Sequence, residues 1–253
     1  MPSPHGSFTW YELITPNAAA AAEFYGAVVG WNARPVAGGP MDYTVLQMGE
    51  TGVAGILTLP AGGPPPVWLG YISVDDLDAH LDRLTKAGGS IHQPPVEIPD
   101  MLRFSVVADP QGAAFVLFQP YSDAAPPPAL PDKPGFTAWR ELMAGDGAAA
   151  FDFYSSLFGW TKAEAHDMGP MGVYQLFADK GETVGGMMTK PPNLPAPAWT
   201  FYFRVDAIGA AAERLKTAGG TVVNGPMQVP GGDWIVQAQD PQGAKFALHS
   251  PNP

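Results

Sequence analysis

The sequence predicts an α+β protein that consists of two tandem domains, each made of two strand–helix–three-strand modules. Two observations support this fold class. The second half of the chain repeats the landmarks of the first half, and within each half the order of strand, helix and three strands begins again. Self-similarity at a constant offset indicates a duplicated structural unit, so one module used four times accounts for the whole sequence.

Several short motifs carry the repeat. The Trp-Tyr-Glu-Leu motif at Trp10 reappears as Trp-Arg-Glu-Leu at Trp139. After a two-residue insertion, the Asp-Pro-Gln-Gly motif at Asp109 reappears at Asp240. Further matches are Phe24-Tyr25 with Phe153-Tyr154, Gly30-Trp31 with Gly159-Trp160, Trp68 with Trp199, and Val74-Asp75 with Val205-Asp206. Many separate landmarks agree with a single insertion, so we interpret the chain as a tandem duplication.

The duplication predicts domain 1 over residues 1–120 and domain 2 over residues 136–253. Residues 121–135 between them are rich in proline, which fixes φ and cannot continue a helix or a central strand. We therefore expect an extended linker between the two domains.

Each half begins with a strand and a helix. The apolar and aromatic residues of 8–14 are typical of a β-strand. Asn17 is a suitable N-cap for the alanine-rich helix that follows, and Asp146 has the same position in the second half. Short strands are expected next at residues 43–48 and 53–59.

The order then begins again with a strand at residues 68–74. Asp75 or Asp76 is the expected N-cap of the next helix, and Asp206 is its counterpart in the second half. The expected buried faces of these two helices are Leu77, Leu81 and Leu84, and Ile208, Ala212 and Leu215. Three further strands are expected near Ile91, at residues 103–108 and at residues 114–118.

Composition limits the classes of function. Hydrophobic residues make up 46% of the chain and charged residues 15%, which is typical of a folded globular protein. A net charge of −11 with only 13 Lys and Arg argues against nucleic acid and anionic membranes as partners. There is no cysteine, no signal-peptide pattern and no apolar run of membrane-spanning length. We expect a cytoplasmic protein whose partner is a small-molecule ligand.

The element order and motifs resemble the vicinal oxygen chelate superfamily, which contains glyoxalase I, bleomycin-resistance proteins and extradiol dioxygenases. The features that carry the resemblance are the helix with Phe24-Tyr25, the Gly30-Trp31 after it, Val74-Asp75-Asp76-Leu77 and the Asp-Pro-x-Gly turn at Asp109. The two-domain layout resembles the branch of the mycobacterial culture-filtrate antigen. The resemblance implies tandem glyoxalase-like domains, in which four βαβββ modules form open β-sheet cups with the helices outside and the ligand inside.

The resemblance also implies where a metal would bind. The family usually holds a divalent metal by a His or Gln on the first strand, a His on the fifth and a Glu on the eighth. The matching residues are Trp10, Leu69 and Val116 in domain 1, and Trp139, Thr200 and Ala247 in domain 2. None of these side chains is a credible metal ligand, so the sequence predicts neither a metal nor another cofactor.

Strand alternation selects a different set of candidates. Trp10 and Glu12 share one face of the first strand, as Trp139 and Glu141 do in domain 2. Burial raises the pKa of a carboxyl towards the range that suits a general base. Glu12 and Glu141 are therefore the candidate catalytic residues, which would remove a proton from a carbon next to a carbonyl. The alternative is that each glutamate only accepts hydrogen bonds from the fold, for example from Arg140.

Aromatic residues on the same faces favour a planar or apolar ligand, with core packing as the alternative. Among the histidines, His249 lies two residues past Ala247 and shares its face, whereas His80 and the other three are interpreted as surface or loop residues. The predicted ligand-pocket residues are Trp10, Tyr71, Phe118, Trp139, Thr200, Tyr202, Arg204 and His249.

Three functions remain open at this point. The first is a metal-independent lyase or isomerase that uses a glutamate as base, and the second is a non-catalytic protein that sequesters its ligand, as bleomycin-resistance proteins do. The third, a metal-dependent glyoxalase or dioxygenase, is disfavoured by the replaced ligand positions. Whether the chain is an enzyme, which cup is functional and which molecule binds are left open. Two covalently joined domains are compatible with a monomer or with a homodimer.

Overall fold

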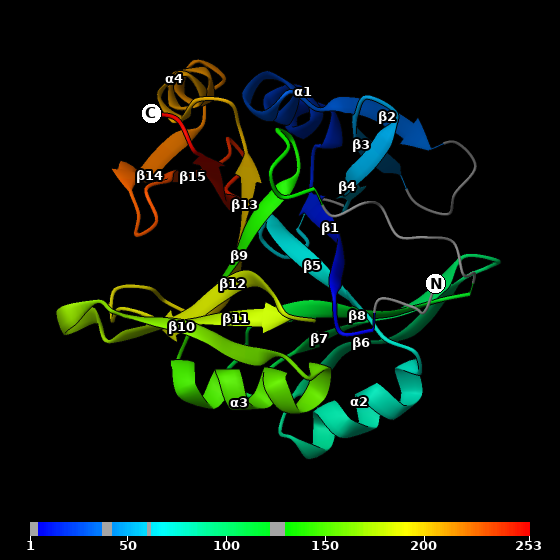
Figure 1. The fold of residues 1–253 in the computed structure, drawn as a ribbon. Coiled ribbons are helices and arrows are strands. Elements are labelled where there is room, and N and C mark those ends of the chain that lie inside the picture. The colour runs from blue at the N-terminus through cyan, green and yellow to red at the C-terminus, as the bar shows by residue number, and fades with distance from the viewer. Residues whose placement is uncertain (1–4, 37–41, 60–61, 122–129) are drawn as a thin grey trace. The chain divides into compact units, whose positions relative to one another are not determined.

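A computed structural model describes residues 5–36, 42–59, 62–121 and 130–253 (Figure 1). The first two modules comprise β1 (Phe8–Thr15), α1 (Ala18–Val29), β2 (Asn32–Val36), β3 (Tyr43–Met48) and β4 (Thr51–Thr58), then β5 (Val67–Ser73), α2 (Leu77–Lys86), β6 (Ser90–Ile98), β7 (Leu102–Ala108) and β8 (Ala114–Pro120). The last two comprise β9 (Thr137–Ala144), α3 (Gly147–Phe158), β10 (Thr161–Asp167), β11 (Val173–Asp179) and β12 (Glu182–Thr189), then β13 (Ala198–Arg204), α4 (Ile208–Thr217), β14 (Thr221–Gln228), β15 (Trp234–Gln239) and β16 (Lys245–Ser250).

The strands form two eight-stranded sheets with equivalent topology. Their orders are β2-β3-β4-β1-β5-β8-β7-β6 and β10-β11-β12-β9-β13-β16-β15-β14. Each order runs between two different end strands, so both sheets are open and neither is a closed barrel. The predicted α+β fold of four strand–helix–three-strand modules is thereby confirmed. Within the described ranges, no helix is both long and apolar enough to cross a bilayer.

The predicted helix caps are confirmed except for one. The side chains of Asn17, Asp76 and Asp146 each accept a hydrogen bond from the first turn of the helix that follows. The predicted cap at Asp206 is wrong, because α4 begins one residue later and its N-cap, Ala207, offers no side-chain acceptor. The carbonyl oxygen of Asp206 instead accepts hydrogen bonds from the side chains of Ser250, the last residue of β16, and Asn252.

Two further expectations concern His80 and the linker. His80 is not a surface or loop residue: it is 2% exposed, because its position on α2 falls on the buried face between Leu77 and Leu84. Its Nδ1 bonds to the carbonyl oxygen of Asp76 at 2.8 Å, which indicates a structural role. Residues 122–129 of the predicted linker lie outside the described residues, and the segment that follows forms turns.

The chain packs as two compact units, and each unit combines one module from each repeat. Unit 1 contains α2 and α3 with β6–β8 and β10–β12, together with β5 from Gly70 and β9 from Arg140. In this unit the two helices contact each other, α2 packs on β6–β8 and α3 packs on β11 and β12 (Figure 1). Unit 2 contains α1 and α4 with β2–β4 and β14–β16, together with β1 from Trp10 and β13 from Thr200. Here α1 contacts α4.

A buried hydrogen-bond network joins the two modules of unit 2. The hydroxyl of Tyr25 donates to Asp240 Oδ2 at 3.2 Å and accepts from Trp68 Nε1 at 2.8 Å. Asp240 Oδ1 accepts from the backbone N–H groups of Gln242 and Ala244, which shapes the Asp-Pro-Gln-Gly turn. Burial, followed by the charge of Asp240, raises the pKa of Tyr25 well above its ordinary value, so the phenol remains a hydrogen-bond donor.

Unit 1 contains the same network at the repeated positions. The Tyr154 hydroxyl donates to Asp109 Oδ2 at 3.1 Å and accepts from Trp199 Nε1 at 3.0 Å. Burial and the charge of Asp109 again raise the pKa of Tyr154. The side chain of Gln111, in the same turn, bonds to both backbone groups of Asp146 just before α3. Three of the repeated landmarks, the Phe-Tyr pair, the single tryptophan and the Asp-Pro-Gln-Gly turn, therefore hold the modules together.

We predict that Tyr25→Phe destabilises the protein by about 1–3 kcal/mol, because the Trp68 N–H and an oxygen of Asp240 lose their buried partner. Denaturant unfolding followed by circular dichroism measures this free energy. The control is Tyr121→Phe at an exposed tyrosine, for which we expect a change within about 0.5 kcal/mol. Equal losses for the two variants would contradict a structural role for the buried network.

Candidate functional site

The candidate site in domain 1 lies on one face of β1–β4, in unit 2. Trp10 Nε1 donates to the Tyr43 hydroxyl at 3.0 Å, and that hydroxyl is hydrogen-bonded to the Glu12 carboxylate. Glu12 is only 6% exposed. Burial, followed by the charge of Glu12, raises the pKa of Tyr43, so the phenol stays protonated and donates to the carboxylate.

Two glycines make room for this chain of groups. Gly55 is the register partner of Glu12 on β4, and a Cβ atom there would lie 2.0 Å from the Tyr43 oxygen and 3.2 Å from Trp10 Nε1. At Gly52 a Cβ atom would lie 3.4 Å from both the Trp10 ring and Val45. The indole and the phenol therefore lie directly over β4, beside Glu12. We call this surface the β1–β4 face.

Domain 2 repeats part of this arrangement in unit 1. Glu141 is 7% exposed and is the register partner of Gly186 on β12. A Cβ atom at Gly186 would lie 2.3 Å from the ring of Tyr174, which occupies the repeat position of Tyr43. Both candidate glutamates thus stand beside a glycine that is covered by a tyrosine. The sequence prediction missed both tyrosines, although their repetition on the third strand of the module was a usable signal.

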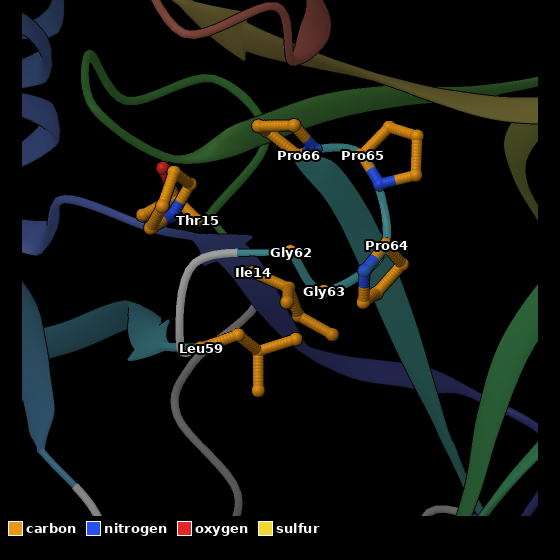
Figure 2. Close-up of a pocket in the computed structure, with 9 residues that line it drawn as sticks. Ile14, Thr15, Leu59, Gly62, Gly63, Pro64, Pro65 and Pro66 are labelled. Carbon is orange, nitrogen blue, oxygen red and sulfur yellow. The ribbon is translucent and has the colours of Figure 1, made fainter.

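A small apolar cavity of about 260 Å³ lies at the end of β1 (Figure 2). Ile14, which shares the side of β1 that carries Trp10 and Glu12, forms part of its wall. The other lining residues are Thr15, Pro16, Leu59, Gly62, Gly63, Pro64, Pro65 and Pro66. This cavity was not predicted from the sequence.

In unit 1, the strands of the second module bring two predicted pocket residues together. The ring of Tyr71 lies 6.0 Å from that of Phe118 and 6.4 Å from that of Phe104, between centroids. Phe104 was missed, although it pairs with Phe118 in the β7–β8 register. Val116, one of the family's metal positions, pairs with Tyr71 and is fully buried. This surface is therefore aromatic and apolar.

The corresponding surface of the fourth module, in unit 2, is polar. Arg204 approaches His249 Nδ1 at 3.3 Å, and His249 Nε2 lies 3.0 Å from Asp233 Oδ2. Tyr202 accepts a hydrogen bond from Gln237 at 3.0 Å. The structure thus brings together the three predicted residues on β13 and β16 and adds Asp233 and Gln237 from β15 and its preceding turn. The remaining predicted pocket residues, Trp139 on β9 and Thr200 on β13, are half-buried.

The donor groups in the described part of the chain do not fit a divalent metal. Within the ranges that the structure describes, no group of three or more His, Cys, Asp or Glu side chains could hold a metal ion. His249 and Asp233 supply two donors, but Arg204 places a positive charge beside them. The six positions that the family uses carry indole, alkyl and hydroxyl side chains, none of which matches the nitrogen and carboxylate ligands of such sites.

Comparison with known proteins agrees with the fold. The sequence model of the Glyoxalase/Bleomycin resistance protein/Dioxygenase superfamily matches residues 7–117 and again residues 137–248. The chain belongs to this superfamily. A putative glyoxylase, CFP32 of Mycobacterium tuberculosis, is 34% identical over 98% of this chain and 96% of that protein. The anthracycline biosynthesis protein DnrV of Streptomyces peucetius is 31% identical over 96% of this chain and 92% of its own length.

Solved structures share the fold at low sequence identity. The Mn(II)-bound glyoxalase of Novosphingobium aromaticivorans superposes with a TM-score of 0.67 at 15% identity, over 99% of this chain and 84% of that chain. The 2,2',3-trihydroxybiphenyl 1,2-dioxygenase of Sphingomonas wittichii gives a TM-score of 0.68 at 13% identity, over 97% of this chain and 90% of that chain. At such identities the likeness establishes the fold alone, and the chemistry depends on the side chains described above.

We predict opposite shifts in the pKa of His249 for two substitutions. Burial, ahead of all other causes, holds this pKa below its ordinary value, while Asp233 raises it and Arg204 lowers it. Arg204→Ala should therefore raise the pKa and Asp233→Asn should lower it further, as measured by NMR titration of the imidazole. Lys86→Ala, on α2, is the control and should leave the titration unchanged. Shifts of the same sign in the two variants would contradict this description of the cluster.

Proposed function

We propose that this protein removes a proton from a carbon next to a carbonyl in a small organic ligand, with Glu12 as the base. One observation carries this proposal: Trp10, Tyr43 and Glu12 form a hydrogen-bonded chain that ends on a buried carboxylate. A buried carboxylate is costly unless it is paired and hydrogen-bonded, and the Tyr43 hydroxyl supplies one such hydrogen bond to Glu12. Membership of the glyoxalase superfamily is compatible with this chemistry.

The proposed reaction is an isomerisation in which Glu12 carries the proton. The carboxylate takes a proton from a carbon that carries a hydroxyl group, and the electron pair moves onto the neighbouring carbonyl oxygen to give an enediolate. The proton then returns to the former carbonyl carbon, while the hydroxyl proton passes to the oxygen on that carbon and leaves a new carbonyl behind. Atoms and electrons balance without an oxidant or another reactant. Tyr43 fixes the orientation of the carboxylate, since its raised pKa keeps the phenol a donor at neutral pH. Trp10 offers an aromatic surface for the body of the ligand.

A second candidate function is ligand binding without turnover. The aromatic surface of the second module favours it, because Tyr71, Phe104 and Phe118 offer stacking area. Such a surface binds planar molecules through area burial and aromatic contacts. If the protein binds a planar ligand tightly, and neither the wild type nor any variant exchanges a proton of that ligand, this function is supported over proton transfer.

We expect chelator treatment to leave ligand binding and any turnover unchanged, because the side chains at the family's metal positions cannot coordinate a cation. Elemental analysis of gently purified protein, before and after washing with chelator, is the measurement. A stoichiometric metal that survives the washing, or activity that returns only with added metal, would contradict the proposal.

Glu12→Gln should lower the rate of proton transfer by about 10²–10⁴-fold, because the amide cannot accept the proton. The assay uses methylglyoxal and phenylglyoxal, each with and without a small thiol, in deuterated water, and NMR follows product and deuterium incorporation. Glu141→Gln is tested in parallel, because the two glutamates occupy equivalent positions.

Glu23→Gln is the matched control, since Glu23 is an exposed glutamate on α1. This variant should retain the wild-type rate. All three variants should unfold at similar denaturant concentrations, which separates loss of chemistry from loss of structure. Undiminished turnover in a folded Glu12→Gln protein would exclude Glu12 as the base.

A further inference from the structure

Arg34 lies on the β1–β4 face at the opposite edge from Glu12. The strand registers pair Arg34 with Val45, Val45 with Gly55, and Gly55 with Glu12. Paired residues on neighbouring strands project from the same face of a sheet. Arg34 and Glu12 are therefore the two ends of one row that crosses all four strands.

A cavity of about 480 Å³ adjoins Arg34 on this face. Its lining includes three consecutive residues of the edge strand β2 and alternate residues of β3. The lining residues are Arg34, Pro35, Val36, Val45 and Gln47. Val45 continues the wall towards Trp10, since both side chains approach the same point above Gly52. The Val45 side of the cavity therefore lies next to the Trp10 indole, on the face that carries Glu12.

The guanidinium of Arg34 differs from the other five arginines of the chain. Arg34 is exposed and makes no ion pair or side-chain hydrogen bond with any residue in the described part of the chain. The others each contact a carboxylate, an imidazole or a backbone carbonyl: Arg83 with His80, Arg103 with Asp78, Arg140 with Val184, Arg204 with His249, and Arg214 with Ala27. A free guanidinium at the mouth of a cavity is suited to bind a carboxylate through two parallel hydrogen bonds.

We infer that the ligand is an aromatic or similarly bulky carboxylate, which Arg34 binds through its anionic group. The inference rests on the proposed function, because it places the reacting end of the same ligand at Glu12. Three strand spacings of about 4.8 Å separate the two Cα atoms by roughly 14 Å. A two-carbon or three-carbon acid is too short for this separation, whereas a ring system over Val45 and Trp10 spans it.

This anion site belongs to domain 1. The repeat position of Arg34 in domain 2 is Ala163, counted from the matching Gly-Trp motifs. Domain 2 keeps Glu141 beside Tyr174 but has no cation at the matching position of β10. The two cups therefore differ in the charge of the ligand that they accept, although both retain the buried carboxylate.

The test uses 2-naphthoate and its neutral analogue 2-naphthamide as probes, with isothermal titration calorimetry as the readout. The wild-type protein should bind the carboxylate at least tenfold more tightly than the amide. Arg34→Ala should weaken binding of 2-naphthoate about tenfold and leave 2-naphthamide unchanged, and Arg34→Lys should fall between. Lys86→Ala removes the same charge from α2 and should change neither affinity.

The controls separate this inference from the proposed function. Glu12→Gln should bind 2-naphthoate at least as tightly as the wild type, because the substitution removes a negative charge from the same face. Suppose that Arg34→Ala weakens binding of 2-naphthoate but Glu12→Gln keeps the wild-type rate of proton exchange. The carboxylate site would then stand, and Glu12 would be excluded as the catalytic base. Equal affinity of wild type and Arg34→Ala for 2-naphthoate, or an equal loss in Lys86→Ala, would overturn the carboxylate site.

Discussion

Each compact unit depends on one buried tyrosine hydroxyl that bonds a tryptophan N–H on one side and an aspartate on the other. Tyr25 makes this link to Asp240 in unit 2, and Tyr154 makes it to Asp109 in unit 1. A buried carboxylate without such partners would cost several kcal/mol, so the three residues constrain one another. The tyrosine comes from the first helix of one repeat and the aspartate from the last turn of the other. This constraint gives the Phe-Tyr and Asp-Pro-Gln-Gly motifs a structural role, in contrast to the Trp-x-Glu-Leu motif that carries Glu12.

The same three chemical groups recur at the candidate site, but there the carboxylate is a candidate for catalysis and not part of a packing network. Trp10, Tyr43 and Glu12 repeat the order of indole, phenol and carboxylate. Asp240 and Asp109 are also bound by the backbone N–H groups of their own turns, which commits them to structure. Glu12 instead lies within a strand, on a face that continues into a cavity. The position of the carboxylate in the fold, and not its partners alone, therefore separates a packing network from a candidate for catalysis.

Much of this arrangement follows from local patterns in the chain, and the errors have physical causes. Alternation along β1 was enough to place Trp10 beside Glu12, because side chains in a strand alternate between its two faces. Tyr43 could not be found in this way, since it lies on β3 and reaches Glu12 across β4, so its position depends on strand pairing that alternation within β1 does not give. His80 was wrongly placed at the surface because a polar side chain is usually exposed, although its spacing from Leu77 and Leu84 puts it on the buried face of α2. The carbonyl oxygen of the N-cap, Asp76, provides the hydrogen-bond partner that the buried imidazole needs. The N-cap predicted at Asp206 lies one residue before the observed N-cap of α4, which is within the usual error of helix boundaries.

The pairing of modules between repeats also sets an order of assembly. The second and third modules, which form most of unit 1, are neighbours along the chain, whereas unit 2 needs both the first module and the fourth. At the usual rates of translation, the first module waits on the order of ten seconds while the intervening residues are synthesised. During that interval the apolar side of α1 lacks α4, its eventual neighbour. The first module thus completes its core only after the three later modules have been synthesised.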